Sequence, residues 1–280
     1  MSAVRPPKSV LITGCSSGIG RCAAESLKAR GYRVLASARR WEDVARLTAE
    51  GFEALTLDLA DSDSIARAVE TVQQWTEGRL YGLFNNAAYG QPGAVEDLTR
   101  EALRAQFETN LFGTHELTVR LLPGFRAQGE GRIIQNSSIL GFAAMKYRGA
   151  YNASKFALEG LTDTLRLELQ GTGVEVSLIQ PGPITSRFRD TALRHYRARI
   201  DAAQSPHRVT YEALEARLLK EGPAAPFTLG PEAVVRCLIH ALESPRPRVR
   251  YPVTFPTHLF GVLKRLIPDR ALDALLSRIE

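Results

Sequence analysis

The stretch T-G-C-S-S-G-I-G (13–20) decides the fold of this chain. It follows the apolar run SVLIT (9–13) and precedes a segment of helical periodicity, residues 19–30. A glycine-rich turn that leads from a buried strand into a helix is typical of the first unit of a nucleotide-binding α/β fold. The stretch, called the glycine loop below, therefore predicts a parallel sheet with a phosphate site at the start of the first helix.

The glycines have separate tasks in such a loop. Gly14 permits a tight turn, while Gly18 and Gly20 leave no side chain where backbone must approach a pyrophosphate or pack against the sheet. A helix that begins near Ile19 presents free N–H groups and the positive end of its dipole to phosphate oxygens. The predicted phosphate-binding residues are Gly14, Ser16, Ser17, Gly18, Ile19 and Gly20.

The rest of the chain continues the alternation of strand and helix. Further apolar runs with little in/out alternation indicate parallel strands buried on both faces. They are YRVLAS (32–37), EALTL (53–57), LYGLFN (80–85), RIIQNS (132–137), VEVSLIQ (174–180) and a short last strand near 248–253. Helical patterns occupy 63–76, 101–127, 150–170 and 231–243. Regular β-α-β alternation predicts a doubly wound sheet that binds its ligand at the C-terminal strand ends.

We expect the 280 residues to form a single domain. Its cofactor half covers about 8–137 and its catalytic and substrate half about 138–257. Residues 183–230, called the insert, are expected to form helices and loops between the sixth strand and the last one. Residues 258–280, called the tail, have an amphipathic helical pattern broken at Pro268. The tail could dock on its own domain, form a dimer contact or rest on a membrane surface.

Composition sets limits on the function. Hydrophobic residues make up 44% and charged residues 24%, which is typical of globular proteins. No signal sequence is visible, and no uncharged apolar run reaches the length of a membrane span. Three cysteines without metal-type spacing favour a reduced, cytoplasmic protein with no metal site. The net charge of +6 indicates an arginine-rich surface or an anionic cofactor, and no nucleic-acid-binding motif accompanies it.

The end of the second strand predicts which cofactor is bound. NAD enzymes place an acidic residue about 20 residues beyond the glycine loop to hold the ribose hydroxyls. Here Ala38 occupies that place, and Arg39 and Arg40 follow. The missing carboxylate removes repulsion against a 2′-phosphate, and a guanidinium supplies paired donors for it. We therefore expect NADP(H) in preference to NAD(H).

Four more motifs follow the glycine loop in order. They are N-N-A-A-Y-G (85–90), I-I-Q-N-S-S (133–138), Y-N-A-S-K (151–155) and P-G-P-I-T-S (181–186). Taken together, they resemble the short-chain dehydrogenase/reductase family over roughly residues 8–252. The resemblance implies a Rossmann-type sheet of about seven strands in the order 3-2-1-4-5-6-7. The chain departs from the family pattern at Ala88, where a glycine is expected, and at Ser186, which replaces a usual threonine.

The resemblance also assigns roles to residues. Asp58 and Leu59 match the position that contacts the adenine, and the segment 181–186 matches the one that closes over the nicotinamide. The further cofactor-binding residues that it implies are Asn85, Ala87, Tyr151, Lys155, Pro181, Gly182, Ile184 and Ser186. The catalytic residues that it implies are Asn110, Ser138, Tyr151 and Lys155.

A physical argument supports the catalytic set. Tyr151 and Lys155 lie one helical turn apart and share a face. The Lys155 ammonium and an oxidised nicotinamide both favour phenolate, so we expect the pKa of Tyr151 to be lowered from about 10. Tyr151 can then act as general base or general acid, and Ser138 can hydrogen-bond to the reacting oxygen. The resemblance implies that Asn110 holds a water that links Lys155 to solvent.

The substrate is expected to be a lipophilic alcohol or ketone bound over the nicotinamide, as in hydroxysteroid or retinol dehydrogenases. Apolar residues for such a pocket occur after Ser138 and in the insert. They are Leu140, Phe142, Ala143, Ala144 and Met145, and Phe188, Leu193, Tyr196, Ile200, Leu214, Leu218 and Phe227. His195 and nearby arginines could instead hold an acidic group. We expect a homo-oligomer; alternative functions are a dinucleotide-sensing regulator without catalysis and an epimerase or dehydratase.

Overall fold

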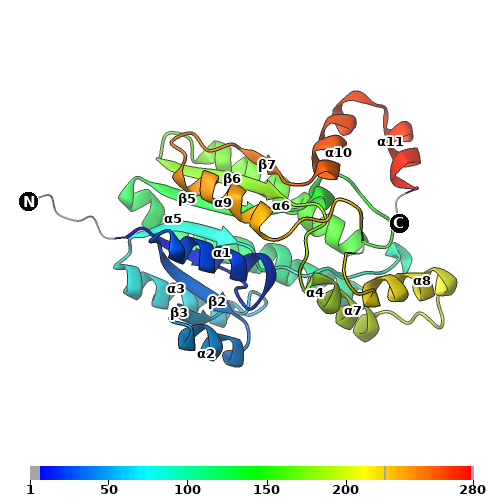
Figure 1. Cartoon of the computed structure of the whole chain (residues 1–280), viewed down its shortest axis with the longest axis horizontal. Helices are drawn as coiled ribbons and strands as arrows, with labels where there is room; N and C mark the ends of the chain where they lie inside the picture. Colours follow the sequence, from blue (N-terminus) through cyan, green and yellow to red (C-terminus); the bar gives the residue numbers. More distant parts are fainter. Residues whose placement is uncertain (1–6, 224, 279–280) are drawn as a thin grey trace, which may run out of the picture.

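The computed structural model describes residues 7–223 and 225–278 and contains a seven-stranded parallel sheet with helices on both faces (Figure 1). The strands are β1 (Ser9–Ile12), β2 (Arg33–Ala38), β3 (Glu53–Thr56), β4 (Leu80–Asn85), β5 (Gly131–Asn136), β6 (Val174–Gln180) and β7 (Arg250–Pro252). Their order is β3-β2-β1-β4-β5-β6-β7, and each neighbouring pair is parallel. The predicted fold class and strand order are confirmed.

Eleven α-helices connect and follow the strands in the described residues. They are α1 (Gly18–Ala29), α2 (Trp41–Ala49), α3 (Ser62–Thr76), α4 (Arg100–Phe107), α5 (Gly113–Gln128), α6 (Gly149–Glu168), α7 (Phe188–Arg199), α8 (Arg208–Leu219), α9 (Glu232–Glu243), α10 (Phe255–Leu266) and α11 (Asp269–Leu276). Helix α2 was not predicted. It is short and exposed, since Leu47 is its buried residue, and so its apolar signal is weak.

The helix predicted over 101–127 is divided in the structure. A π-helical segment, η2 (Glu108–Phe112), separates α4 from α5 and contains Asn110. Each residue of such a segment bonds one position farther along the chain, which widens the helix, and such segments occur often at functional sites. Apolar periodicity does not reveal this change because the backbone remains helical on both sides.

Successive strand residues pack into opposite cores. Val10 and Ile12 of β1 face the core formed with α1 and α9, whereas Leu11 faces the core formed with α3 and α5. All three side chains are fully buried. Burial on both faces explains why the strand sequences are continuously apolar rather than alternating. It also forces the catalytic and binding residues to the ends of the strands.

The insert and the tail lie at the same end of the molecule (Figure 1). The tail packs on its own chain: Phe260, Leu272 and Leu276 are buried against Leu140 in η3 (Ile139–Gly141). This is the first of the three expected positions of the tail. The outer face of α10 stays exposed. Within residues 7–223 and 225–278, no helix combines the length and the apolar character that a membrane span requires.

Candidate active site

The glycine loop has the geometry of a phosphate cradle. Gly14 and Gly18 have φ angles of +76° and +57°, in the left-handed region that favours glycine. A Cβ added at Gly20 would lie 2.2 Å from the carbonyl oxygen of Gly14, so the loop closes only with glycine there. The side chain of Ser17 makes no capping hydrogen bond to the first turn of α1. The N–H groups at this helix start can therefore face an anion, which fits a dinucleotide.

Asn86 holds the glycine loop against the neighbouring strand ends. Its Nδ2 donates to the carbonyl oxygen of Thr13 (2.9 Å), and its own N–H donates to Thr13 Oγ1 (2.9 Å). Nδ2 of Asn136 donates to Asn86 Oδ1 (3.0 Å), which links the ends of β4 and β5. Asn86 was not among the predicted site residues.

The predicted residue Asn85 faces the other way. Its Nδ2 donates to Thr118 Oγ1 of α5 (2.9 Å), and the side chain is buried. Consecutive strand residues point to opposite faces, so the strand end separates Asn85 from Asn86. That alternation was the signal that could have picked out Asn86 as the residue directed at the loop. Ala87 follows, and a Cβ at Gly14 would touch its Cα at 3.0 Å.

The predicted adenosine side is open and basic. Arg39 and Arg40 are exposed directly after β2, and Arg40 pairs loosely with Glu42 at 3.5 Å. Asp58 and Leu59 follow β3, where Oδ1 of Asp58 accepts from the N–H of Ala60 (3.0 Å). A carboxylate at the end of β2 is replaced by the buried Ala38. Two cations without an acid at the end of this strand match the pattern that predicts a 2′-phosphate.

Ser138, Tyr151 and Lys155 come together beside the C-terminal end of β5. The Ser138 hydroxyl accepts from the N–H of Leu140 (3.0 Å) and hydrogen-bonds to Tyr151. Lys155 is almost completely buried, and its Nζ donates to the carbonyl oxygen of Asn136 (2.7 Å). The helix spacing predicted from the sequence thus places both α6 residues at the end of β5.

Asn110 connects this group to the segment after β4. Its Oδ1 accepts from the N–H of Tyr89 (3.1 Å), and its Nδ2 donates to the carbonyl oxygen of Tyr89 (2.9 Å). The same Nδ2 reaches Ser154 Oγ (3.3 Å), next to Lys155 in the sequence. The π-helical widening places Asn110 where it can make contacts on both sides. In the described contacts it positions backbone, and it has no direct contact with Lys155.

The expected lowering of the Tyr151 pKa is wrong for the protein without its cofactor. Burial raises the pKa of Tyr151 to about 12, and the hydrogen bond from Ser138 opposes this effect. Lys155 Nζ lies 5.8 Å from the centre of the Tyr151 ring and is directed at Asn136 instead. Burial lowers the pKa of Lys155 to about 8, with Glu159 opposing it. Sequence spacing placed the pair correctly but did not include the cost of burying charge.

The segment from Pro181 to Ser186 crosses the end of the sheet toward the glycine loop. The carbonyl oxygen of Pro181 accepts from the N–H of Ile139 (2.8 Å), which joins it to the Ser138 loop. A Cβ at Gly182 would lie 2.1 Å from Thr254 Oγ1. Farther along, Ile184 bridges to Leu229. Ser186 Cβ lies 3.1 Å from a Cβ built at Gly18, so this segment meets the loop directly.

Phe188 is the residue of the insert that reaches Tyr151. Its ring meets the Tyr151 ring edge-on, with centroids 5.3 Å apart. A Cβ at Gly90 would lie 2.8 Å from Phe188 Cζ, so glycine makes room for the ring. His195 stacks on Tyr89 with centroids 3.9 Å apart and contacts Arg199. Burial, followed by the charge of Arg199, lowers the pKa of His195 to about 4, so it is neutral near pH 7.

Several residues expected to line a substrate pocket instead form the interior of the insert. Tyr196 and Ile200 are buried with Ala94 and Tyr211, and Leu193 and Leu214 pack against them. Phe227 is 58% exposed and packs on Phe255. Leu140 and Ala143 lie beneath the tail, with Phe142 and Met145 at the edge of the same cluster. The periodicity of a helix shows that a face is apolar but not what covers it.

The family model of the short chain dehydrogenases matches residues 8–197, more than half of the chain. The chain belongs to the short-chain dehydrogenase family. It is therefore an oxidoreductase, and the nicotinamide dinucleotide that this family uses fits the glycine loop described above. The match covers all of the strands but β7, together with the Ser138–Tyr151–Lys155 group.

Relatives within and near this family match nearly the whole chain. An Escherichia coli protein called uncharacterized oxidoreductase YbbO is 46% identical over 270 residues, which is 96% of this chain and 94% of its own. Human 17-beta-hydroxysteroid dehydrogenase type 6 is 33% identical over 97% of this chain and 88% of its own. Human retinol dehydrogenase 5 is also 33% identical, over 96% of this chain and 87% of its own.

A solved short-chain dehydrogenase/reductase from Burkholderia phymatum, in complex with NAD, has the same fold. It superposes with a TM-score of 0.77 at 25% sequence identity and covers 96% of this chain and 95% of its own. The similarity therefore extends beyond the residues matched by the family model to β7 and α10. Variation within the family concerns which dinucleotide is bound and what lies over it.

We expect Gly20→Ala to weaken dinucleotide binding by on the order of 100-fold, since the displaced loop loses one or two N–H contacts to phosphate. Its Cβ would overlap the Gly14 carbonyl oxygen at 2.2 Å. Gly160→Ala is the matched control, because nothing lies within 4 Å of a Cβ at that helical position. Fluorescence titration with NADH and NADPH, alongside thermal unfolding, measures both variants. Unchanged binding by Gly20→Ala would contradict the assignment of the cradle.

Proposed function

We propose that this protein is an NADP(H)-dependent oxidoreductase that interconverts a lipophilic primary or secondary alcohol with its aldehyde or ketone. The observation that carries the proposal is the convergence of Ser138, Tyr151 and Lys155 at the end of β5, on the same edge of the sheet as the glycine loop. A proton-transfer group beside a dinucleotide cradle is what reversible hydride chemistry at a carbonyl needs.

The nicotinamide, when bound, supplies or accepts the hydride. The chain handles the proton. Because burial raises its pKa to about 12, the Tyr151 hydroxyl is protonated near neutrality and can donate to the oxygen of a carbonyl being reduced. Lys155 stabilises the phenolate that results, and the Ser138 hydroxyl hydrogen-bonds to the substrate oxygen. In the oxidation direction, the same phenolate removes the alcohol proton.

The substrate side supports an apolar compound. Phe188 presents its ring beside Tyr151, and Leu140 lies in the loop after Ser138. Two of the relatives, the hydroxysteroid and retinol dehydrogenases, have names that specify lipophilic alcohols. An apolar wall with a few polar groups at one end selects such compounds by burial and orients them by the reacting oxygen.

The function is tested with a panel of lipophilic alcohols and ketones, followed at the NADPH absorbance band. We expect turnover by the parent protein and a loss of at least about 1,000-fold in Tyr151→Phe, because general acid–base catalysis contributes roughly 100- to 10,000-fold. NADPH binding should survive in this variant, since only a hydroxyl is removed. Near-parent turnover by Tyr151→Phe would rule out the proposed proton donor.

The preference for NADP(H) is proposed to depend on Arg39. We expect Arg39→Ala to weaken NADPH binding by about 10- to 100-fold, the value of one or two charge-assisted hydrogen bonds, and to leave NADH binding nearly unchanged. Arg67→Ala serves as control, because Arg67 is equally exposed but lies on α3 and pairs loosely with Asp61. The preference is refuted if parent protein binds NADH as tightly as NADPH, or if Arg39→Ala does not alter their ratio.

Two exposed apolar faces support the proposed partners. One lies on η2, α5 and α6 and suits a second copy of the chain; its residues are Phe112, Val119, Phe156 and Leu167. The other lies on the outer side of α10 beside Lys264 and Arg265 and suits weak contact with an anionic membrane surface; its residues are Phe255, Leu259, Val262 and Leu266.

We expect light scattering of detergent-free protein to give a mass of at least twice the monomer, because an apolar face of this kind is rarely left uncovered. Added anionic vesicles should bind part of the protein at low salt. A monomeric mass would contradict the proposed oligomer. Protein that fails to sediment with the vesicles would remove the membrane contact.

A further inference from the structure

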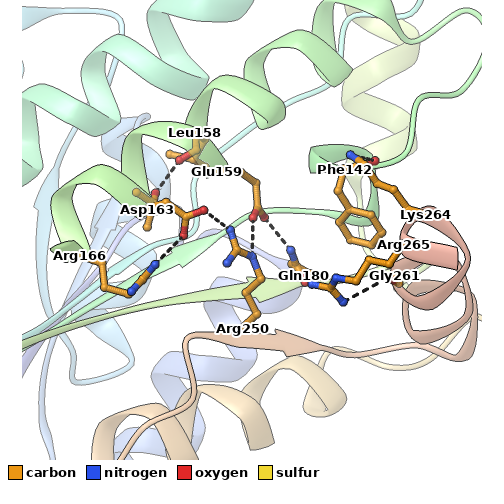
Figure 2. A network of polar contacts seen from close by, with 11 residues as sticks. Phe142, Leu158, Glu159, Asp163, Arg166, Gln180, Arg250, Gly261, Lys264 and Arg265 are labelled. Atoms are coloured by element: carbon orange, nitrogen blue, oxygen red, sulfur yellow. Dashed lines mark hydrogen bonds and ion pairs between the residues drawn. The ribbon is translucent and has the colours of Figure 1, made fainter. Parts of the chain in front are cut away.

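Helix α6 continues the line of catalytic side chains by one more turn. Glu159 follows Lys155 by four residues and Tyr151 by eight, so the three side chains share a face. Glu159 is only 7% exposed. A carboxylate that is removed from water needs charged or hydrogen-bonding partners, because an isolated buried charge is costly. Figure 2 shows that it has such partners on the adjacent strands.

The partners of Glu159 come from β6 and β7. Nε2 of Gln180 donates to its Oε1 (3.0 Å), and Nε of Arg250 donates to its Oε2 (3.1 Å). The other side of the Arg250 guanidinium donates to Asp163 Oδ2 (2.5 Å), so Arg250 lies between two carboxylates of α6 (Figure 2). Asp163 has a second cation, Arg166, at 3.3 Å.

Glu159 also packs against the loop that carries Ser138. A Cβ at Gly141 in η3 would lie 2.9 Å from Glu159 Cγ and 3.2 Å from its Oε1, so glycine makes room for the carboxylate. The side chain therefore touches η3, β6 and β7 from within α6. These elements hold Ser138 and the segment at Pro181, and α6 itself holds Tyr151 and Lys155.

The charges around Lys155 are unequal. Tyr151, Asn136 and Ser154 surround the buried ammonium with neutral groups, and Glu159 brings a formal negative charge from one turn away. Its field raises the pKa of Lys155 against the larger effect of burial. The charges that face Glu159 are Lys155 and Asp163 on α6 and Arg250 on β7; Gln180 on β6 is neutral.

We propose that Glu159 is a positioning residue that keeps Lys155 protonated in the pH range where Tyr151 transfers its proton, and that Arg250 sets how much of the Glu159 charge acts on Lys155. The proposal rests on the proposed function for its role in turnover. Arg250 partly neutralises Glu159, because a guanidinium in direct contact with a carboxylate offsets its field. Asp163 shares Arg250 but lies one turn farther from Lys155 and pairs with two guanidinium groups.

The pH dependence of kcat tests the proposal. Deprotonation of Lys155 should produce a loss of activity at alkaline pH. Glu159→Gln removes a negative charge, which lowers the proton affinity of Lys155, so this limb should move to lower pH by about one unit, a tenfold change in affinity. Arg250→Gln removes a positive charge and should move the limb to higher pH. Asp163→Asn is the matched control and should leave it nearly unmoved.

Opposite shifts in Glu159→Gln and Arg250→Gln distinguish charge from mere support of the fold. A structural role predicts lower turnover in both variants with one common pH profile, and that result would overturn the proposal. Equal shifts in Glu159→Gln and Asp163→Asn would overturn it as well. If Glu159→Gln does not fold, the direction of the Arg250→Gln shift decides, with Glu159→Asp expected to keep the parent profile.

A second readout needs no substrate. The chain has six lysines, so the 13C resonances of their ε-carbons can be titrated by NMR, with Lys155 assigned by Lys155→Arg. We expect the Lys155 titration to shift down in Glu159→Gln and up in Arg250→Gln. An unshifted Lys155 titration would refute the inference even in an active enzyme. An inactive parent protein with the expected NMR shifts would refute the proposed function and leave the inference standing.

Discussion

The hydrogen bond from the Lys155 ammonium to the carbonyl oxygen of Asn136 fixes the catalytic helix to the sheet. It spans 2.7 Å and is fully buried, so the ammonium has no alternative partner in water. Because Asn136 is the last residue of β5, this bond sets Lys155, and Tyr151 one turn before it, against Ser138 two residues beyond the strand. The cost is a lysine whose pKa falls to about 8. The surroundings of α6 then have to sustain that charge.

A second constraint comes from the glycine loop. Gly20 approaches the Gly14 carbonyl so closely that α1 packs directly on the turn, and Asn86 ties the turn to β4. Through Asn136 the same network reaches β5. The cradle for phosphate and the proton-transfer group are thus joined by side-chain amides at one edge of the sheet. Distances between hydride and proton chemistry are set by a rigid part of the molecule, as precise catalysis requires.

Local rules account for what could be predicted. Continuous apolar runs gave the strands, since both faces of a parallel sheet are buried. The glycine spacing and the four-residue spacing of Tyr151 and Lys155 depend only on backbone geometry. By contrast, the π-helical segment at Asn110 leaves no mark in the apolar pattern. Phe188 lies 37 residues from Tyr151, and nothing in its neighbourhood indicates that its ring would meet the catalytic tyrosine.

The sequence by itself determined the order of strands and helices, the phosphate-binding turn and the identity of the proton-transfer residues, because each depends on contacts between near neighbours in the chain. Only the tertiary structure decided which of Asn85 and Asn86 supports the loop, how the tail is docked and which charge faces Lys155. Those outcomes depend on residues far apart, such as Glu159 and Arg250, brought together by β6 and β7. Burial and Coulomb interaction are properties of that assembled environment, and spacing along the chain does not contain them.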